Sequence, residues 1–378
     1  MHGHSEGNDH NGRSDRSRAH KVKKYLLEKY AGKKVLVTGH TGFKGSWLVF
    51  ILNHLGSKVY GFSLDEPSDF RHIYHALSIG QIIQNPEAKF GDVRDSAQLK
   101  KLIESANPDF IFHLAAQAIV SNSFSDPVDT VSTNIIGTLN ILELVRTTVA
   151  HSTLVLVTSD KCYRNTGERK SYTESDELGG TDIYSASKAS AELVIRAYFE
   201  MYPNVFAELG ASSVRAGNVF GGGDWSENRL VPDCVRASIR DEALQIRMPN
   251  ATRPWTAVQD ILVGYLTVAI RTREGLNFSN EPWNFASTER MTVLEVGQEV
   301  NKSLGAGAPI EFGGLADFSE EEELQIDPSK AIERLGWKTK FPLKQSLART
   351  SEWYVAQLNG EDMTLHTSLY LTDFLGDS

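Results

Sequence analysis

Short apolar runs alternate with longer amphipathic stretches along the first half of the chain. The apolar runs fall at residues 35–37, 58–62, 88–90, 110–114 and 154–157, and apolar residues recur at helical spacing around 47–55, 99–103 and 131–145. Such short runs between glycine or polar turns are typical of buried strands. Strands that alternate with helices predict an α/β fold with a parallel, doubly wound sheet.

The alternation loosens after about residue 219, where glycines and scattered Pro, Trp and Arg predict loops and short helices. We expect residues 219–378 to form mainly a smaller substrate-binding lobe over the carboxyl ends of the strands. Residues 21–218 are then the nucleotide-binding domain, entered by a short basic helix from Lys21 to Tyr30. Residues 1–20 are polar and contain four His, and we expect a flexible tail rather than a metal site.

Composition narrows the choice of partners. The formal net charge of -9 argues against nucleic acid. No apolar run approaches the ~18 residues of a membrane span, so no membrane partner is expected. The two cysteines, Cys162 and Cys234, are too few for a disulfide framework and predict a cytoplasmic protein.

A glycine turn follows the first predicted strand and opens a helix. It reads Gly39-His40-Thr41-Gly42-Phe43-Lys44-Gly45, and glycine at these three places permits a tight turn and close approach of a pyrophosphate to the helix N-terminus. The arrangement predicts a Rossmann-type dinucleotide site.

The GxxGxxG spacing resembles that of short-chain dehydrogenases/reductases. Two further segments fit the adenine pocket of that superfamily, namely Gly91-Asp92-Val93 and Leu114-Ala115-Ala116. Asp65, near the end of the second strand, could bind the ribose hydroxyls and repel a 2′-phosphate, although Ser63 occupies the usual position. No Arg follows closely to bind a phosphate, so NAD is favoured over NADP.

Tyr184 and Lys188 are the candidate redox pair. Their i, i+4 spacing places both on one helix face, where a lysine ammonium and a positive nicotinamide would lower the phenol pKa from its usual value near ~10. The same spacing at Tyr25/Lys29 and Tyr30/Lys34 precedes the nucleotide-binding strand, and we interpret it as a surface helix and its exit.

A polar cluster, Thr158-Ser159-Asp160-Lys161, ends the fifth predicted strand. A Ser or Thr at such a place is enough for simple redox chemistry. Asp160 and Lys161 add an acid and a base candidate, which together suit the elimination of water. The alternative is a surface Asp–Lys pair at a strand exit.

Several segments are similar to those of the CDP-glucose 4,6-dehydratases, a family of extended short-chain dehydrogenases/reductases. They are Gly39 to Leu48, Thr158 to Tyr163, Val214 to Val219, Gly223 to Asp233, Ser329 to Ala331 and Leu335 to Trp337. The resemblance covers roughly residues 33–350.

This resemblance implies the NAD-dependent conversion of CDP-glucose to CDP-4-keto-6-deoxyglucose. Tyr184, assisted by Lys188 and Ser159, would deprotonate the 4-hydroxyl while NAD takes the C4 hydride and later returns it to C6. Lys161 would remove the C5 proton, and Asp160 would protonate the departing 6-hydroxyl. The implied substrate contacts are Asn218, Arg229, Leu230, Pro232 and Arg253, and a homodimer joined by helices is expected.

Two places depart from the family pattern. Ser121 replaces an Arg, and Ala257 lies in an altered segment after Arg253-Pro254-Trp255. Both leave the hexose and nucleotide open. A 4-epimerase, a dehydratase of another nucleotide sugar and a non-catalytic NAD-binding protein are the alternatives. Trp225 and Trp255 could equally be packing residues.

Overall fold

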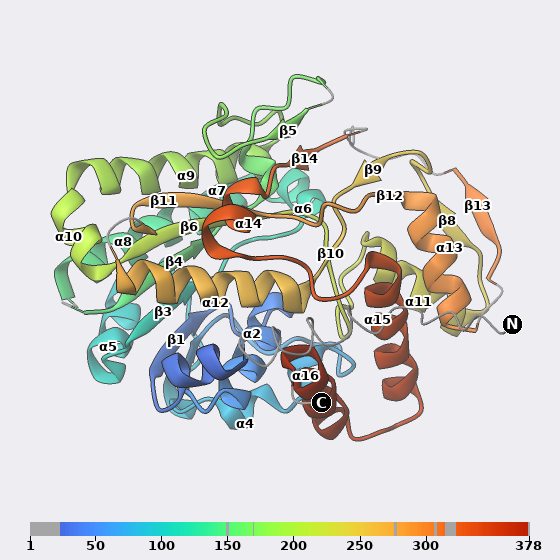
Figure 1. Cartoon of the computed structure of the whole chain (residues 1–378), viewed down its shortest axis with the longest axis horizontal. Helices are drawn as coiled ribbons and strands as arrows, with labels where there is room; N and C mark the ends of the chain where they lie inside the picture. Colours follow the sequence, from blue (N-terminus) through green and yellow to red (C-terminus); the bar gives the residue numbers. More distant parts are fainter. Residues whose placement is uncertain are drawn as a thin grey trace, which may run out of the picture.

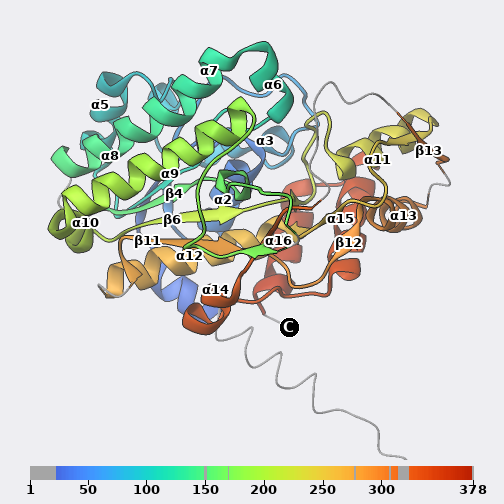
Figure 2. The same ribbon diagram turned by 90° about the horizontal axis from the view of Figure 1, so that it is seen from above.

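The computed structural model describes residues 23–148, 151–168, 170–275, 278–305, 308–313 and 323–376. Within them, six parallel strands lie in the order β2, β1, β3, β4, β6, β11 and span Lys58–Phe62, Lys34–Thr38, Phe110–His113, Thr153–Val157, Ala211–Ala216 and Glu281–Phe285. Helices cover both faces of this sheet (Figures 1 and 2). The predicted α/β class with a parallel, doubly wound sheet is confirmed.

Alternate residues of each strand pack on opposite faces of the sheet. Val35 and Val37 of β1 belong to the core cluster beneath α2 (Phe43–His54) and α12 (Val258–Glu274). Leu36 belongs to the cluster formed with α5 (Ser96–Ala106), α8 (Gly137–Thr148) and α9 (Ile183–Met201). Parallel strands covered on both faces need apolar side chains at every position, which explains the continuous apolar runs.

The other elements are short or lie toward the carboxyl edge of the sheet. The helices are α3 (Ile73–Ala76), α4 (Ile79–Ile82), α6 (Val120–Ser125), α7 (Pro127–Val131), α10 (Pro203–Leu209), α11 (Leu230–Arg240), α13 (Val293–Ser303), α14 (Ser329–Leu335), α15 (Leu343–Leu358) and α16 (Met363–Leu375). The strand pairs are β7 (Val219–Phe220) with β10 (Thr256–Ala257), β9 (Thr252–Arg253) with β12 (Met291–Thr292), β8 (Leu244–Ile246) with β13 (Ile310–Phe312) and β5 (Ser171–Tyr172) with β14 (Gln325–Ile326).

Two sequence-based element assignments were wrong. Residues 88–90 do not form a strand, because a 3-10 turn over Pro86–Ala88 is followed only by a single bridge between Phe90 and Ser63. The helix expected from Val131 begins earlier, at Pro127, where Asp126 accepts a hydrogen bond from the Asp129 amide. It then passes through a π turn at Ser132–Ile136 into α8.

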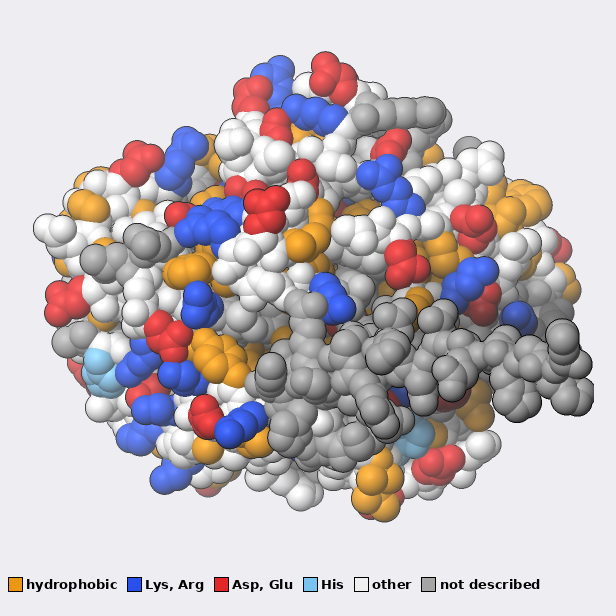
Figure 3. All heavy atoms as spheres, in the orientation of Figure 1, with side chains coloured by type: hydrophobic (Ala, Val, Ile, Leu, Met, Phe, Trp, Pro, Cys, Tyr) orange, Lys and Arg blue, Asp and Glu red, His pale blue; other side chains and the backbone are white. Residues whose placement is uncertain are grey.

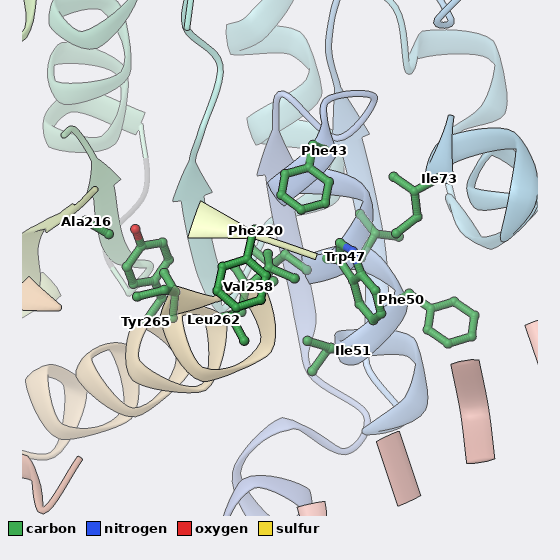
Figure 4. Close-up of a cluster of buried hydrophobic side chains, with 14 of the residues drawn as sticks. Phe43, Trp47, Phe50, Ile51, Ile73, Ala216, Phe220, Val258, Leu262 and Tyr265 are labelled. Carbon is green, nitrogen blue, oxygen red and sulfur yellow. The ribbon is translucent and has the colours of Figure 1, made fainter. Parts of the chain in front are cut away.

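The second half of the chain contributes to the nucleotide-binding core as well as to the substrate lobe. Strand β11 pairs with β6, and α12 packs against α2 and the sheet, so these elements extend the nucleotide-binding core. Figure 4 shows the buried cluster to which this contact belongs, with Phe43, Trp47 and Ile51 from α2 and Val258, Leu262 and Tyr265 from α12. The substrate lobe is therefore not one continuous stretch after residue 219, and a domain boundary at 218 stays a prediction.

The N-terminal segment differs from the expectation of a surface helix. Residues 23–30 are helical, but Tyr30 is fully buried and its hydroxyl donates a hydrogen bond to the Leu266 carbonyl at 2.9 Å. The tail predicted at residues 1–20 lies outside the described residues.

The surface carries mixed charge. On the face shown in Figure 3, Lys and Arg side chains are interspersed with Asp and Glu. Among the residues that the structure describes, no helix is long and apolar enough to cross a membrane.

Asp260 joins α12 to the segment before α15. Its carboxylate accepts a hydrogen bond from the Lys340 amide at 2.7 Å, and its carbonyl accepts one from the Trp337 indole at 2.9 Å. Burial raises the pKa of this carboxyl to about 7, which outweighs the opposing effect of Lys340.

Because the folded state holds this proton more tightly than the unfolded chain, Asp260 contributes stability below its unfolded pKa of 3.8 that is lost as pH rises through about 7. We expect the difference in Tm, Asp260→Asn minus wild type, to increase as the pH is raised from about 4 to about 8. Thermal melts across this range check it, with Asp241→Asn at an exposed site as control. A Tm difference independent of pH would contradict the assignment.

Candidate active site

One cavity of about 960 Å³ lies at the carboxyl edge of the sheet. Parallel strands place their carboxyl ends at the same edge, so residues that follow β1, β3, β4 and β6 meet there. The residues of α11 and β8 close the cavity from the other side. Its volume is at the upper end for small-molecule sites and suits two ligands.

The glycine turn after β1 forms one end of this cavity. Gly39 has φ +74°, and a side chain there would place its Cβ 2.7 Å from the Ala115 amide nitrogen. A Cβ on Gly45 would overlap the Gly39 carbonyl oxygen, so α2 begins directly against the turn. The turn leaves the N-terminus of α2 open to the cavity, which fits a dinucleotide pyrophosphate.

The predicted cofactor residues line this cavity with one exception. Those at the cavity are Gly39, Thr41, Gly42, Phe43, Lys44, Gly45, Asp92, Val93, Leu114, Ala115, Ala116, Tyr184 and Lys188. Asp65 is exposed and lies outside the lining, whereas Ser63 lies within it and its hydroxyl is 2.6 Å from that of Thr41. Ser63 was noted in the sequence but not chosen, since an acidic residue is the stronger signal for a ribose contact.

Helix α9 presents the candidate redox pair to the cavity. Asp182 caps the helix by accepting a hydrogen bond from the Ser185 amide at 2.9 Å. Burial lowers the pKa of Lys188 to about 7, and the charge of Lys44 adds to this effect. Burial also raises the pKa of Tyr184 to about 12, although a hydrogen bond with Ser159 lowers it. We expected Lys188 and the nicotinamide to lower the pKa of Tyr184, but in the protein without a ligand this pKa is raised.

The turn after β4 carries the candidate acid and base. Ser159 caps a 3-10 turn at Asp160–Cys162, and its hydroxyl donates a hydrogen bond to the Asp160 carboxylate at 2.9 Å. Asp160 is 5% exposed and packs so closely on the backbone that a Cβ at Gly217 would overlap its carboxylate. A surface Asp–Lys pair is thus wrong for Asp160, and Lys161 lines the cavity as well.

Lys44 lies closer to the candidate catalytic residues than the sequence suggested. Burial lowers its pKa to about 8, Arg229 lowers it further, and Asp160 opposes both. The motif placed Lys44 only beside a cofactor, because nothing in its spacing shows that the side chain reaches the turn after β4.

The predicted substrate residues lie at the same cavity. Asn218, Arg229, Leu230, Pro232 and Arg253 all line it. Arg229 donates to the Asp224 carboxylate at 3.0 Å. Sequence reasoning missed Gln117, Arg236 and Arg247, which also line the cavity and carry no motif of their own.

Two tryptophans and two positions that depart from the family pattern were open in the sequence, and of these four residues only Trp255 lines the cavity. Trp255 lines the cavity, while Trp225 lies outside the lining and packs between Arg71 and Tyr354. Ser121 and Ala257 do not line the cavity, although Val120 and Trp255 close to them in the sequence do. Among the described residues, no group of three His, Cys, Asp or Glu side chains could hold a metal ion.

The chain is similar to one protein family, to a curated relative and to two solved structures. Residues 36–350 match the GDP-mannose 4,6 dehydratase family. The chain is 38% identical to a CDP-glucose 4,6-dehydratase of Salmonella typhimurium, over 92% of this chain and 97% of the relative. Among solved structures, an epimerase of Methanothermobacter thermautotrophicus has a TM-score of 0.74 at 25% identity, covering 89% of this chain and 96% of its own. A dTDP-glucose 4,6-dehydratase of Bacillus anthracis in complex with NAD has 0.71 at 24%, covering 87% and 99%.

The glycine turn gives a direct test of the dinucleotide site. Gly39→Ala combines an unfavourable positive φ with a clash against Ala115, so we expect the affinity for NADH to fall at least about tenfold. Titration of NADH fluorescence measures this, with Gly360→Ala as control, since Gly360 also has φ +76° but has nothing within 4 Å of an added Cβ. Equal affinities in the two variants would contradict the assignment.

Proposed function

The chain belongs to the GDP-mannose 4,6 dehydratase family, and from this membership we propose that it is an NAD-dependent dehydratase that converts CDP-glucose to CDP-4-keto-6-deoxyglucose. The observation that carries the proposal is one cavity lined by both a redox pair, Tyr184 and Lys188, and an acid–base pair, Asp160 and Lys161. The choice of CDP-glucose rests on the 38% identity to an enzyme of that name.

The cofactor site is assigned to the residues around the glycine turn. NAD, when bound, accepts hydride from C4 of the sugar and returns it to C6. Gly39 and Gly45 keep the turn open for the pyrophosphate, and Ser63 and Thr41 lie where a ribose would contact the end of β2. The small residues Ala115 and Ala116 leave room beside them.

The first step assigned to the chain is removal of the proton from the 4-hydroxyl by Tyr184. Burial alone would keep this phenol protonated, since it raises the pKa to about 12. The hydrogen bond with Ser159 works in the opposite direction, and a cation beside the ring is needed to complete the change. Lys188 supplies one, with its Nζ 5.9 Å from the centre of the Tyr184 ring.

The elimination is assigned to Asp160 and Lys161. Once C4 is a ketone, the C5 proton is acidic, and Lys161 is assigned as the base that takes it. Asp160 gives a proton to the 6-hydroxyl, which leaves as water. When hydride returns to C6, C5 regains a proton from Lys161, whose protons exchange with solvent. Ser159 links the candidate acid to the redox pair, because its hydroxyl forms hydrogen bonds with both Asp160 and Tyr184.

The nucleotide part of the substrate is assigned to the far end of the cavity. We assign Arg229 and Arg253, which line the cavity, to the diphosphate, because a guanidinium pairs well with phosphate oxygens. Asn218, with φ +45°, adds a polar contact, and Leu230 and Pro232 border the base.

A homodimer is proposed for the assembled enzyme. Large apolar side chains are exposed on neighbouring helices from α6 to α9, namely Phe124, Val128, Val131, Ile136, Ile183 and Leu193. An apolar surface of this kind on α9, the helix of Tyr184, supports a contact between two copies. The two cysteines are free and buried, which supports a reducing cytoplasm as the location.

Reaction in heavy water tests the proposed conversion as a whole. We expect CDP-glucose to lose one water and to gain one deuterium at C5, as measured by mass spectrometry. Deuterium at C5 without loss of water would indicate an enzyme that oxidises C4 but does not eliminate, whereas a 4-epimerase would return its hydride to C4 and leave the mass unchanged. No change with CDP-glucose, but turnover of another nucleotide sugar, would move the assignment to that substrate.

Single substitutions should separate the two halves of the reaction. Tyr184→Phe removes the base for oxidation, so we expect kcat to fall about 10²- to 10⁴-fold with no keto sugar formed. Asp160→Asn leaves that base in place, and we expect a 4-keto sugar that still holds its 6-hydroxyl. Tyr198→Phe on the same helix removes a contact with Glu143 and should behave as the wild type. A normal product from Asp160→Asn would remove Asp160 from the mechanism.

A further inference from the structure

A buried ion pair lies beneath the catalytic groups. Glu192 and Arg215 are each 3% exposed at the side chain, and their charged atoms are 2.6 Å apart. Glu192 follows Tyr184 and Lys188 by eight and four residues along α9, so the three side chains share one helix face. Arg215 belongs to β6. None of the chemistry described above uses this pair.

Glu192 holds the residue that leads into the catalytic turn. The Thr158 hydroxyl donates a hydrogen bond to Oε1 of Glu192 at 2.5 Å. The Ser213 hydroxyl on β6 donates to the other oxygen, Oε2, at 3.1 Å. Thr158 directly precedes Ser159, so the start of the turn is tied to the helix that carries Tyr184.

Arg215 holds the residue that leads out of the same turn. One of its nitrogens donates a hydrogen bond to the Tyr163 hydroxyl at 2.8 Å, and the guanidinium lies 5.0 Å from the centre of that ring. The Tyr163 hydroxyl in turn donates to Asn284 on β11 at 2.7 Å. The two ends of the turn are thus bound by the two members of one ion pair.

We propose that Glu192 and Arg215 are positioning residues that hold Asp160 and Lys161 in register with Tyr184, so that elimination follows oxidation on the same bound sugar. This inference rests on the proposed dehydratase activity. A buried ion pair contributes little net stability compared with apolar side chains of the same volume, so its placement is better explained by geometry. If this link is weakened, Tyr184 and Lys188 stay on an intact helix while Asp160 and Lys161 shift. Elimination is then impaired more than oxidation.

Direct removal of Glu192 or Arg215 would leave a buried charge without its partner, and such a variant could fail to fold. Thr158→Val avoids this, because it removes one hydroxyl at nearly constant volume and keeps the ion pair. Ser213→Ala is the matched control, since it removes the hydroxyl on the other oxygen of the same carboxylate without touching the turn.

The first readout is the partition of the sugar in acid-quenched reactions with CDP-glucose. For Thr158→Val we expect the ratio of 4-keto sugar that retains its 6-hydroxyl to 4-keto-6-deoxy product to rise about tenfold or more, with KM changed less than about twofold. Ser213→Ala should keep the wild-type ratio. A general loss of rate with an unchanged ratio in Thr158→Val would overturn the proposal.

The second readout needs no substrate. Cys162 ends the turn and is fully buried. We expect a maleimide to label Cys162 several-fold faster in Thr158→Val than in the wild type or Ser213→Ala, with Cys234 unchanged, as read by peptide mass spectrometry. Equal labelling in all three proteins would overturn the proposal. If the wild type forms no keto sugar, the proposed function fails, and the labelling result still decides whether the ion pair holds the turn.

Discussion

The whole site depends on parallel strands whose carboxyl ends lie along one edge of a sheet. This constraint brings the glycine turn after β1, the small residues after β3 and the polar turn after β4 into one cavity, although Gly39 and Lys161 are 122 positions apart in the sequence. The sheet needs cover on both faces for this to hold. From late in the chain, helix α12 covers part of one face and strand β11 extends the sheet beside β6, so the second half of the sequence stabilises the edge at which the first half presents its chemistry.

Burial then gives the side chains at this edge their properties. Lys44 and Lys188 are both pushed toward neutrality by burial, while Tyr184 is pushed away from ionisation. Without ligands, the raised pKa of Tyr184 therefore disfavours removal of a proton from the sugar. A bound nicotinamide would add its positive charge to those of Lys188 and Arg229 near Tyr184, so we expect proton removal from the sugar to be favoured when both ligands are present.

Much of this could be predicted from the sequence, because local patterns carry it. The strands of the first half, the glycine turn and the Tyr184/Lys188 pair all follow from spacing within a few residues. Failures came where tertiary contacts decide. The run at 88–90 makes one bridge instead of a strand, Tyr30 is drawn into the core by a contact with Leu266, and Asp65 turns to solvent while Ser63 faces the cavity. The Glu192–Arg215 pair joins residues that no motif connects, so only the fold reveals it.

The central claim is that oxidation and elimination occur on one sugar in one cavity. CDP-glucose that carries deuterium at C4 tests this most directly, because the same cofactor should return to C6 what it took from C4. The account predicts a 4-keto-6-deoxy product with deuterium at C6, located by nuclear magnetic resonance. A product whose C6 carries only hydrogen, or recovered sugar with deuterium still at C4 and inverted configuration, would contradict it.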